Sequence, residues 1–131
     1  MGSVSLEVGL ESTVEQFVTE DMTAQALGSG EVPVLGTPAL VALVERAAVE
    51  ALSGRLGDGE TSVGATIELH HLAPTPVGGP VMATVRLASI EDRTLDFEIQ
   101  VIDRAGTVAR GRHRRVVVDR DSFLASARNR F

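Results

Sequence analysis

Two segments of the chain carry side chains that could do acid–base or nucleophilic chemistry. Residues 36–45 are mostly apolar, with Thr37 near the start and a single carboxylate, Glu45, at the end. Residues 64–71 alternate between apolar and polar side chains and end in His71. A carboxylate can attack a carbonyl or activate a water, while a hydroxyl and an imidazole can orient groups and move protons. The three side chains are candidates for one catalytic group if the fold brings them together.

A long buried helix is predicted over residues 37–53. Thr37 followed by Pro38 is typical of a helix start, with Thr37 as the N-cap, and Gly54 is a suitable stop. Because apolar residues cover nearly every side, we expect the helix to be buried on most faces. Glu45 is unusual in such a helix, since glutamate is seldom buried without a partner or a function. The competing interpretation is a helix edge that reaches solvent.

A loop of apolar residues precedes this helix. Loops rich in apolar side chains often line a pocket or an interface, so Val34, Leu35 and Gly36 are candidate substrate contacts. The helix start beyond them offers free backbone N–H groups and the positive end of the helix dipole. Such an end can hold a polarised carbonyl oxygen or an anion. Thr37 could serve as a cap alone or as a cap that also contacts the ligand.

Alternating apolar and polar residues predict a sheet. One strand, or two short ones, is expected within residues 5–18. Residues 121–130 are expected to form a short terminal helix, with Asp121 or Ser122 as its cap, or a tail. One face of the sheet must be wet, so the sheet is antiparallel and buries its other face on the helix. This predicts an α+β hot-dog arrangement in a single domain, residues 1–131. The four strands after the helix are expected at residues 63–72, 81–90, 95–102 and 107–118.

Three strand residues add to the candidate site. His71 falls on the strand face that points toward the helix, although a lone histidine there is more often a hydrogen-bonded core residue. Gly64 is either a turn residue or a place where a ligand approaches the backbone. Arg115 shares the inward face of the last strand with His113, and a buried arginine needs a carboxylate or a phosphate as partner.

Composition argues against several classes of function. The chain has 131 residues, a net charge of −6, no cysteine and three histidines, which argues against nucleic-acid binding and against a structural zinc site. No apolar run approaches the length of a membrane span, and the start at Met1 lacks a basic segment. We therefore expect no membrane anchor, no signal peptide and a cytoplasmic location. Arginines gather between residues 104 and 120, where they could bind a phosphorylated small molecule or form a solvated strand.

Together these motifs resemble the fluoroacetyl-CoA thioesterase family of hot-dog proteins. The resemblance rests on residues 34–45, 62–78 and 111–115 in that order and covers about residues 13–124. It implies a homodimer with active sites near the subunit interface, and coenzyme A as part of the substrate, with no cofactor and no metal. The resemblance places the family's catalytic group on Thr37, Glu45 and His71. It places the family's glycine near the thioester carbonyl on Gly64, and the family's pocket arginine on Arg115.

The resemblance implies hydrolysis of a short acyl-CoA thioester, with Glu45 either attacking directly or activating a water. The resemblance implies that aromatic residues before the catalytic threonine gate the pocket of the fluoroacetyl-specific enzyme. Residues 28–36 of this chain contain no aromatic residue, so the resemblance does not specify which acyl group is the substrate. One alternative is a non-catalytic hot-dog module that binds an acyl-CoA or another apolar small molecule. A third interpretation is a hot-dog dehydratase acting on enoyl-CoA, whose usual Asp–His pair fits this chain less well.

Overall fold

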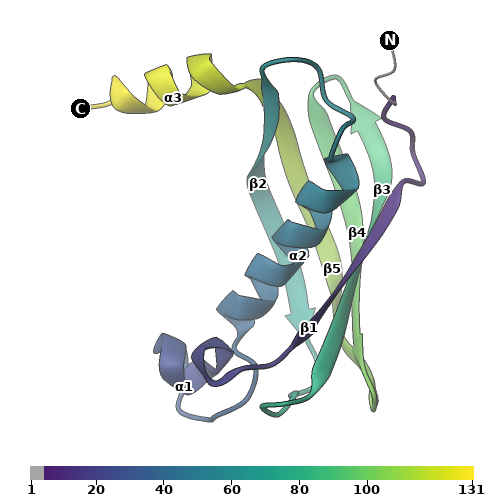
Figure 1. Cartoon of the computed structure of the whole chain (residues 1–131), viewed down its shortest axis with the longest axis vertical. Coiled ribbons are helices and arrows are strands. Elements are labelled where there is room, and N and C mark those ends of the chain that lie inside the picture. The colour runs from purple at the N-terminus through teal and green to yellow at the C-terminus, as the bar shows by residue number, and fades with distance from the viewer. Residues whose placement is uncertain (1–4) are drawn as a thin grey trace.

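A curved antiparallel sheet wraps around one long helix in the computed structural model (Figure 1). The structure describes residues 5–131, so the prediction about a signal peptide, which starts from Met1, lies partly outside the described residues. Within residues 5–131, no helix is long and apolar enough to cross a membrane. The buried apolar side chains of sheet and helix form one core cluster.

The sheet has five strands in the order β1-β3-β4-β5-β2, and every neighbouring pair is antiparallel. The side chains predicted to face inward from β3 and β4 are buried, as period-2 alternation requires. The first strand is shorter than expected, since residues 5–10 lie outside it. The strands are β1 (Glu11–Phe17), β2 (Glu60–His71), β3 (Pro80–Glu91), β4 (Thr94–Asp103) and β5 (Gly106–Asp119).

The long helix α2 spans Thr37–Leu52 and lies across the inner face of the sheet (Figure 1). The expectation that it is buried on most faces was wrong. Val41 and Glu45 are half-buried and Val49 is 50% exposed. These residues are four positions apart, so one stripe of the helix stays uncovered in the single chain. The buried face consists of Leu40, Leu43, Val44, Ala47, Ala48, Ala51 and Leu52.

The start of α2 differs from the prediction by one residue. Gly36 is the N-cap, because its backbone is extended and its carbonyl accepts the first helical hydrogen bond from Leu40 N at 3.1 Å. The chain there packs tightly on the short helix α1 (Ala24–Leu27), since a Cβ on Gly36 would lie 2.9 Å from Ala24 N. Thr37 therefore occupies the first turn, and its hydroxyl makes no capping bond. It is free to bond elsewhere.

Two other segments complete the described chain. The 3-10 helix η1 (Glu20–Met22) precedes α1 at the end of the molecule where α2 begins. The terminal helix α3 (Arg120–Arg128) projects away from the sheet on the side of β2 (Figure 1). Its N-cap is Asp119, whose carboxylate accepts from Ser122 N at 2.9 Å, so the predicted cap at Asp121 or Ser122 was wrong.

Candidate active site

The first part of the site is a threonine–histidine pair where β2 ends beside the start of α2. Thr37 Oγ1 and His71 Nδ1 are 2.9 Å apart, which is hydrogen-bonding distance. The other ring nitrogen, His71 Nε2, is buried and has no partner, alone among the buried side-chain nitrogen and oxygen atoms of residues 5–131. Buried polar atoms are normally bonded, so this nitrogen is available for a ligand, a water or a second subunit.

The second part of the site is an ion pair between helix and sheet. Arg115 Nη1 lies 3.4 Å from Glu45 Oε2, with the arginine side chain 6% exposed and the glutamate 42% exposed. Ser62 holds the rest of the guanidinium: Nε donates to its Oγ at 2.8 Å and Nη2 to its carbonyl at 3.1 Å. Burial lowers the pKa of Arg115, and the neighbouring Glu45 opposes this shift. The partner required by Arg115 is thus a carboxylate of the same chain.

Gly64 makes room for Glu45 at the sheet. A Cβ on Gly64 would collide with Glu45 Oε2 and would lie 3.4 Å from His113 Cε1 and 3.5 Å from Arg115 Nη1. The pairing of β2 with β5 also shifts register between Gly64 and Thr66, which marks a β-bulge. Bulge and glycine together leave a shallow cavity of about 160 Å³, lined by Glu45, Gly64, Ala65, Thr66, Ile67 and His113.

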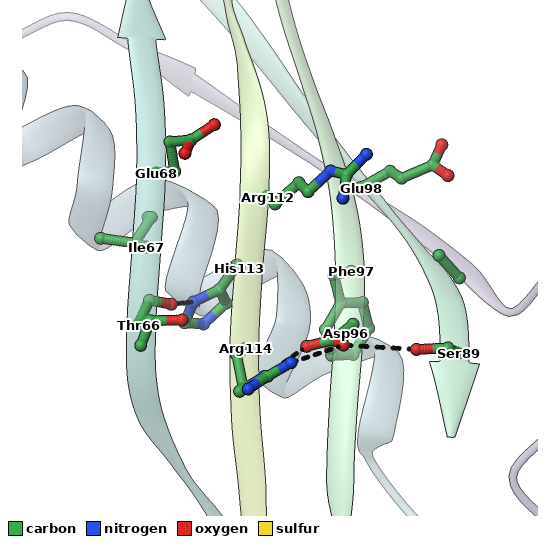
Figure 2. Close-up of a pocket in the computed structure, with 11 residues that line it drawn as sticks. Thr66, Ile67, Glu68, Ser89, Asp96, Phe97, Glu98, Arg112, His113 and Arg114 are labelled. Atoms are coloured by element: carbon green, nitrogen blue, oxygen red, sulfur yellow. Dashed lines mark hydrogen bonds and ion pairs between the residues drawn. The ribbon is translucent and has the colours of Figure 1, made fainter. Parts of the chain in front are cut away.

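A larger hollow of about 610 Å³ lies over the face of the sheet away from α2 (Figure 2). None of Thr37, Glu45 and His71 lines it. Arg114 Nε and Nη2 bind the two carboxylate oxygens of Asp96 at 2.8 and 3.1 Å, and this pairing lowers the pKa of Asp96. Arg114 is thus a solvated arginine paired across strands. The chemistry points to the smaller cavity, where a carboxylate, a glycine and a buried cation meet.

The structure brings the candidate residues together in two groups rather than one. Thr37 contacts His71, while Glu45 contacts Arg115 and faces Gly64. Thr37 and Glu45 are eight positions apart on α2, which separates their backbones by about 12 Å at 1.5 Å per residue. Within one chain the hydroxyl and imidazole therefore lie two helical turns from the carboxylate.

The residues that lead into the helix are placed unequally. Leu35 is 1% exposed and belongs to the core, Gly36 is buried, and Val34 is half-buried. Backbone bonds hold this segment, with Leu35 N donating to Thr75 O at 2.9 Å and Gly36 N to Met22 O at 2.8 Å. Their predicted contacts with substrate remain predictions, and Val34 has the most accessible side chain of the three.

Sequence reasoning assigned no role to Ser62 or to His113, which both contact the Arg115 guanidinium. A signal for His113 was present, since it lies two residues before Arg115 on the same inward strand face. Ser62 carried no such signal, because it reaches Arg115 only through the pairing of β2 with β5.

The family model described as fluoroacetyl-CoA-specific thioesterase matches residues 18–121. The chain belongs to this family. A fluoroacetyl-CoA thioesterase from Streptantibioticus cattleyicolor is 35% identical over 97 residues, which span 74% of this chain and 70% of that protein. The family membership makes the chain a thioester hydrolase by class, as predicted.

Solved structures of similar proteins have the same fold. A structure of the fluoroacetyl-CoA thioesterase FlK superposes with a TM-score of 0.91 at 30% identity, covering 98% of this chain and 99% of that one. A hot-dog-like protein from Thermanaerovibrio acidaminovorans gives a TM-score of 0.88 at 29% identity, covering 95% and 92% of the two chains. The predicted hot-dog fold is therefore confirmed.

Proposed function

We propose that the protein hydrolyses a short acyl-CoA thioester to a free acid and coenzyme A, with Glu45 as nucleophile or general base. The carrying observation is the Glu45 carboxylate at a cavity that Gly64 keeps open. Arg115 contacts the Oε2 atom, which leaves Oε1 for the reaction. The FlK relative supports this reading, since a variant of it, 31% identical, was solved with fluoroacetate and CoA.

The chemistry follows one of two balanced routes. In the first, Glu45 attacks the thioester carbonyl, the C–S bond breaks and coenzyme A leaves as a thiolate. Water then hydrolyses the mixed anhydride, which frees the acid and the Glu45 carboxylate and supplies the proton that the thiolate takes up. In the second, Glu45 removes a proton from a water that attacks the same carbon, the C–S bond breaks, and the proton passes to the leaving thiolate. In both routes the carbonyl oxygen gains negative charge, and close approach to the backbone at Gly64 would bring N–H donors to it. Coenzyme A enters as part of the substrate.

We propose that the complete site forms in a homodimer paired through β2. This strand lies at the edge of the sheet, beside β5 alone, so its outer backbone groups can pair with a second copy. The uncovered helix stripe that includes Val41 and Val49 lies on the same chain surface as Glu45 and would gain a packing partner. A two-fold axis requires antiparallel pairing, which brings the His71 end of one β2 to the Glu60 end of the other.

This pairing joins the two groups of candidate residues. Thr37 and His71 of one protomer approach the partner's Glu45 and the partner's Gly64, and the reverse holds at the second site. His71 Nε2, which has no hydrogen-bond partner among residues 5–131, then faces the reacting groups and can move a proton. Thr37 holds the imidazole through its 2.9 Å contact with Nδ1. The cytoplasmic location and the absence of nucleic-acid partners stay predictions.

A thiol-release assay over a panel of acyl-CoA thioesters tests the proposed function. We expect hydrolysis of short acyl groups, with fluoroacetyl-CoA and acetyl-CoA hydrolysed at comparable kcat/KM, because residues 28–36 contain no aromatic side chain that could gate the pocket. Saturable binding of thioesters without thiol release would instead identify a binding module. Hydration of an enoyl-CoA without thiol release would identify a dehydratase.

Substitution of Gly64 tests the close approach at the carboxylate. Gly64→Ala places a methyl group against Glu45 Oε2, closer than van der Waals contact allows, so the carboxylate must move by about an ångström. We expect kcat/KM to fall about 10²-fold, the usual cost of such a misplacement. The matched control is Gly30→Ala, which adds a methyl group far from Glu45 at a residue with an ordinary φ. Gly54→Ala is unsuitable because Gly54 has a positive φ, where an added side chain strains the backbone. Unchanged kinetics of Gly64→Ala would contradict the proposed geometry.

A further inference from the structure

His113 is a buried histidine beside the proposed nucleophile, and both of its ring nitrogens are engaged. The residue lies on β5 and is 2% exposed. Its Nδ1 lies 2.9 Å from the backbone carbonyl of Thr66, a contact drawn in Figure 2. Its Nε2 lies 3.1 Å from Arg115 Nη1, the same nitrogen that contacts Glu45. The imidazole also stacks on Phe97, with ring centroids 6.4 Å apart.

These two partners select one tautomer of the ring. A carbonyl oxygen can only accept a hydrogen bond, so Nδ1 must carry the proton toward Thr66. A guanidinium can only donate, so Nε2 must present its lone pair to Arg115. The local geometry therefore requires a neutral imidazole with Nδ1–H.

We propose that His113 is a positioning residue of the thioesterase site, acting through Arg115 to hold the Glu45 carboxylate. The inference rests on the proposed function. Ser62 fixes two nitrogens of the guanidinium, Nε and Nη2, and His113 fixes the third, Nη1. Every nitrogen of Arg115 thus has an acceptor, and the one that reaches Glu45 is the one shared with the imidazole. Loss of that acceptor leaves an Nη1–H unsatisfied in a buried site and removes one of the two contacts that hold Nη1 toward the carboxylate.

The surroundings keep His113 neutral. Burial lowers its pKa, and the Arg115 charge lowers it further, whereas the bond to the Thr66 carbonyl and the Glu45 charge oppose the shift. The groups that face the ring are thus Glu45 from α2, the Thr66 carbonyl from β2, Phe97 from β4 and Arg115 from β5. Protonation at Nε2 would set an N–H against a guanidinium N–H and two like charges side by side.

The lowered pKa of His113 sets the direction in which activity and stability change with pH. Because the pKa of His113 in the folded chain is below its ordinary value, the ring stays neutral as pH falls past that value. Activity is then present above the lowered pKa and is lost as pH falls through it. As pH falls from the ordinary pKa to the lowered one, the free energy of unfolding decreases, because in that interval the unfolded chain binds a proton that the folded chain does not.

Two substitutions of His113 separate positioning from packing. Glutamine keeps a side-chain oxygen that can accept from Arg115, while leucine fills the site without an acceptor. We expect His113→Leu to lower kcat about tenfold to a hundredfold, the loss expected for one hydrogen bond to a charged group, with KM changed less than about threefold. His113→Gln should recover most of that loss and should lack the acid limb caused by His113. His70→Gln is the matched control, because His70 is exposed and its one ion-pair partner among residues 5–131 is the exposed Glu68.

Equal kcat values for the wild type and His113→Leu, with a lower melting temperature alone, would overturn the proposal in favour of packing. Nitrogen chemical shifts of the ring give a readout that needs no substrate: the Nδ1–H tautomer, neutral below the ordinary histidine pKa, is expected. An Nε2–H tautomer in an active enzyme would overturn the contact with Arg115 while the proposed function stands. Absence of hydrolysis by the wild type would overturn the proposed function, and with it any catalytic role of His113.

Discussion

Glu45→Gln is expected to lower kcat by about three orders of magnitude, since an amide is neither a nucleophile nor a base at neutral pH. The amide has the size of the carboxylate, and its oxygen can still accept from Arg115, which now contacts Glu45 at 3.4 Å. Substrate binding should therefore survive, with KM changed less than about threefold. Steady-state thiol release over a substrate range measures both constants.

Glu50→Gln supplies the control for this substitution. Glu50 lies on the same helix and is exposed, so the same chemical change is made away from the cavity. Circular dichroism and thermal melting of both variants check that the fold is retained. Undiminished turnover of a well-folded Glu45→Gln protein would remove Glu45 from the mechanism, whereas loss of activity in both variants would point to a general effect on the helix.

Mixing two inactive variants is expected to restore activity if the site is shared between subunits. In a heterodimer of Glu45→Gln and His71→Gln, one site carries both substitutions and the other carries the native His71 with the partner's native Glu45. Random exchange of subunits makes about half of the dimers heterodimers, so the mixture should regain about a quarter of wild-type activity. Each variant alone should remain inactive at every concentration.

The experiment requires exchange, which unfolding and refolding of the mixed proteins provides. The control is the same treatment of each variant alone, and of wild type to set the recovery. No activity in the mixture, with heterodimers demonstrated by mass spectrometry of differently tagged chains, would place the catalytic groups within one chain. Mass measurement of the native wild type adds a direct check, because a monomer at assay concentration would contradict the shared site.

Most of the helices and strands could be predicted from residue types and their spacing. Strict alternation places Leu95 and Phe97 on one face of β4, and this pattern survives folding because a one-residue slip would expose the whole apolar set. Thr37 with Pro38 located the start of α2 to within one residue. Residue types also singled out Glu45, because a carboxylate among apolar helical neighbours is seldom buried without a partner or a function.

Which charged side chains form ion pairs could be learned only from the folded structure. From the sequence, the partner of Arg115 could be a phosphate or a carboxylate. The structure shows that it is the carboxylate of Glu45, which lies 70 positions away in the sequence. The bulge between Gly64 and Thr66 and the missing Cβ of Gly64 provide that reach. The glycine is visible in the sequence, but the bulge is not encoded in the alternation of β2, because a bulge shifts the register without changing the residue types.

The face of α2 that the sheet leaves uncovered could also be learned only from the folded structure. The hydrophobicity of residues 37–53 predicts burial on nearly every side, yet Val41, Glu45 and Val49 form an uncovered stripe in the single chain. An apolar residue has the same transfer free energy whether the sheet of its own chain or another surface covers it, so hydropathy alone does not distinguish the two. Only the packing of α2 on the sheet shows which face remains, and that face carries the proposed nucleophile.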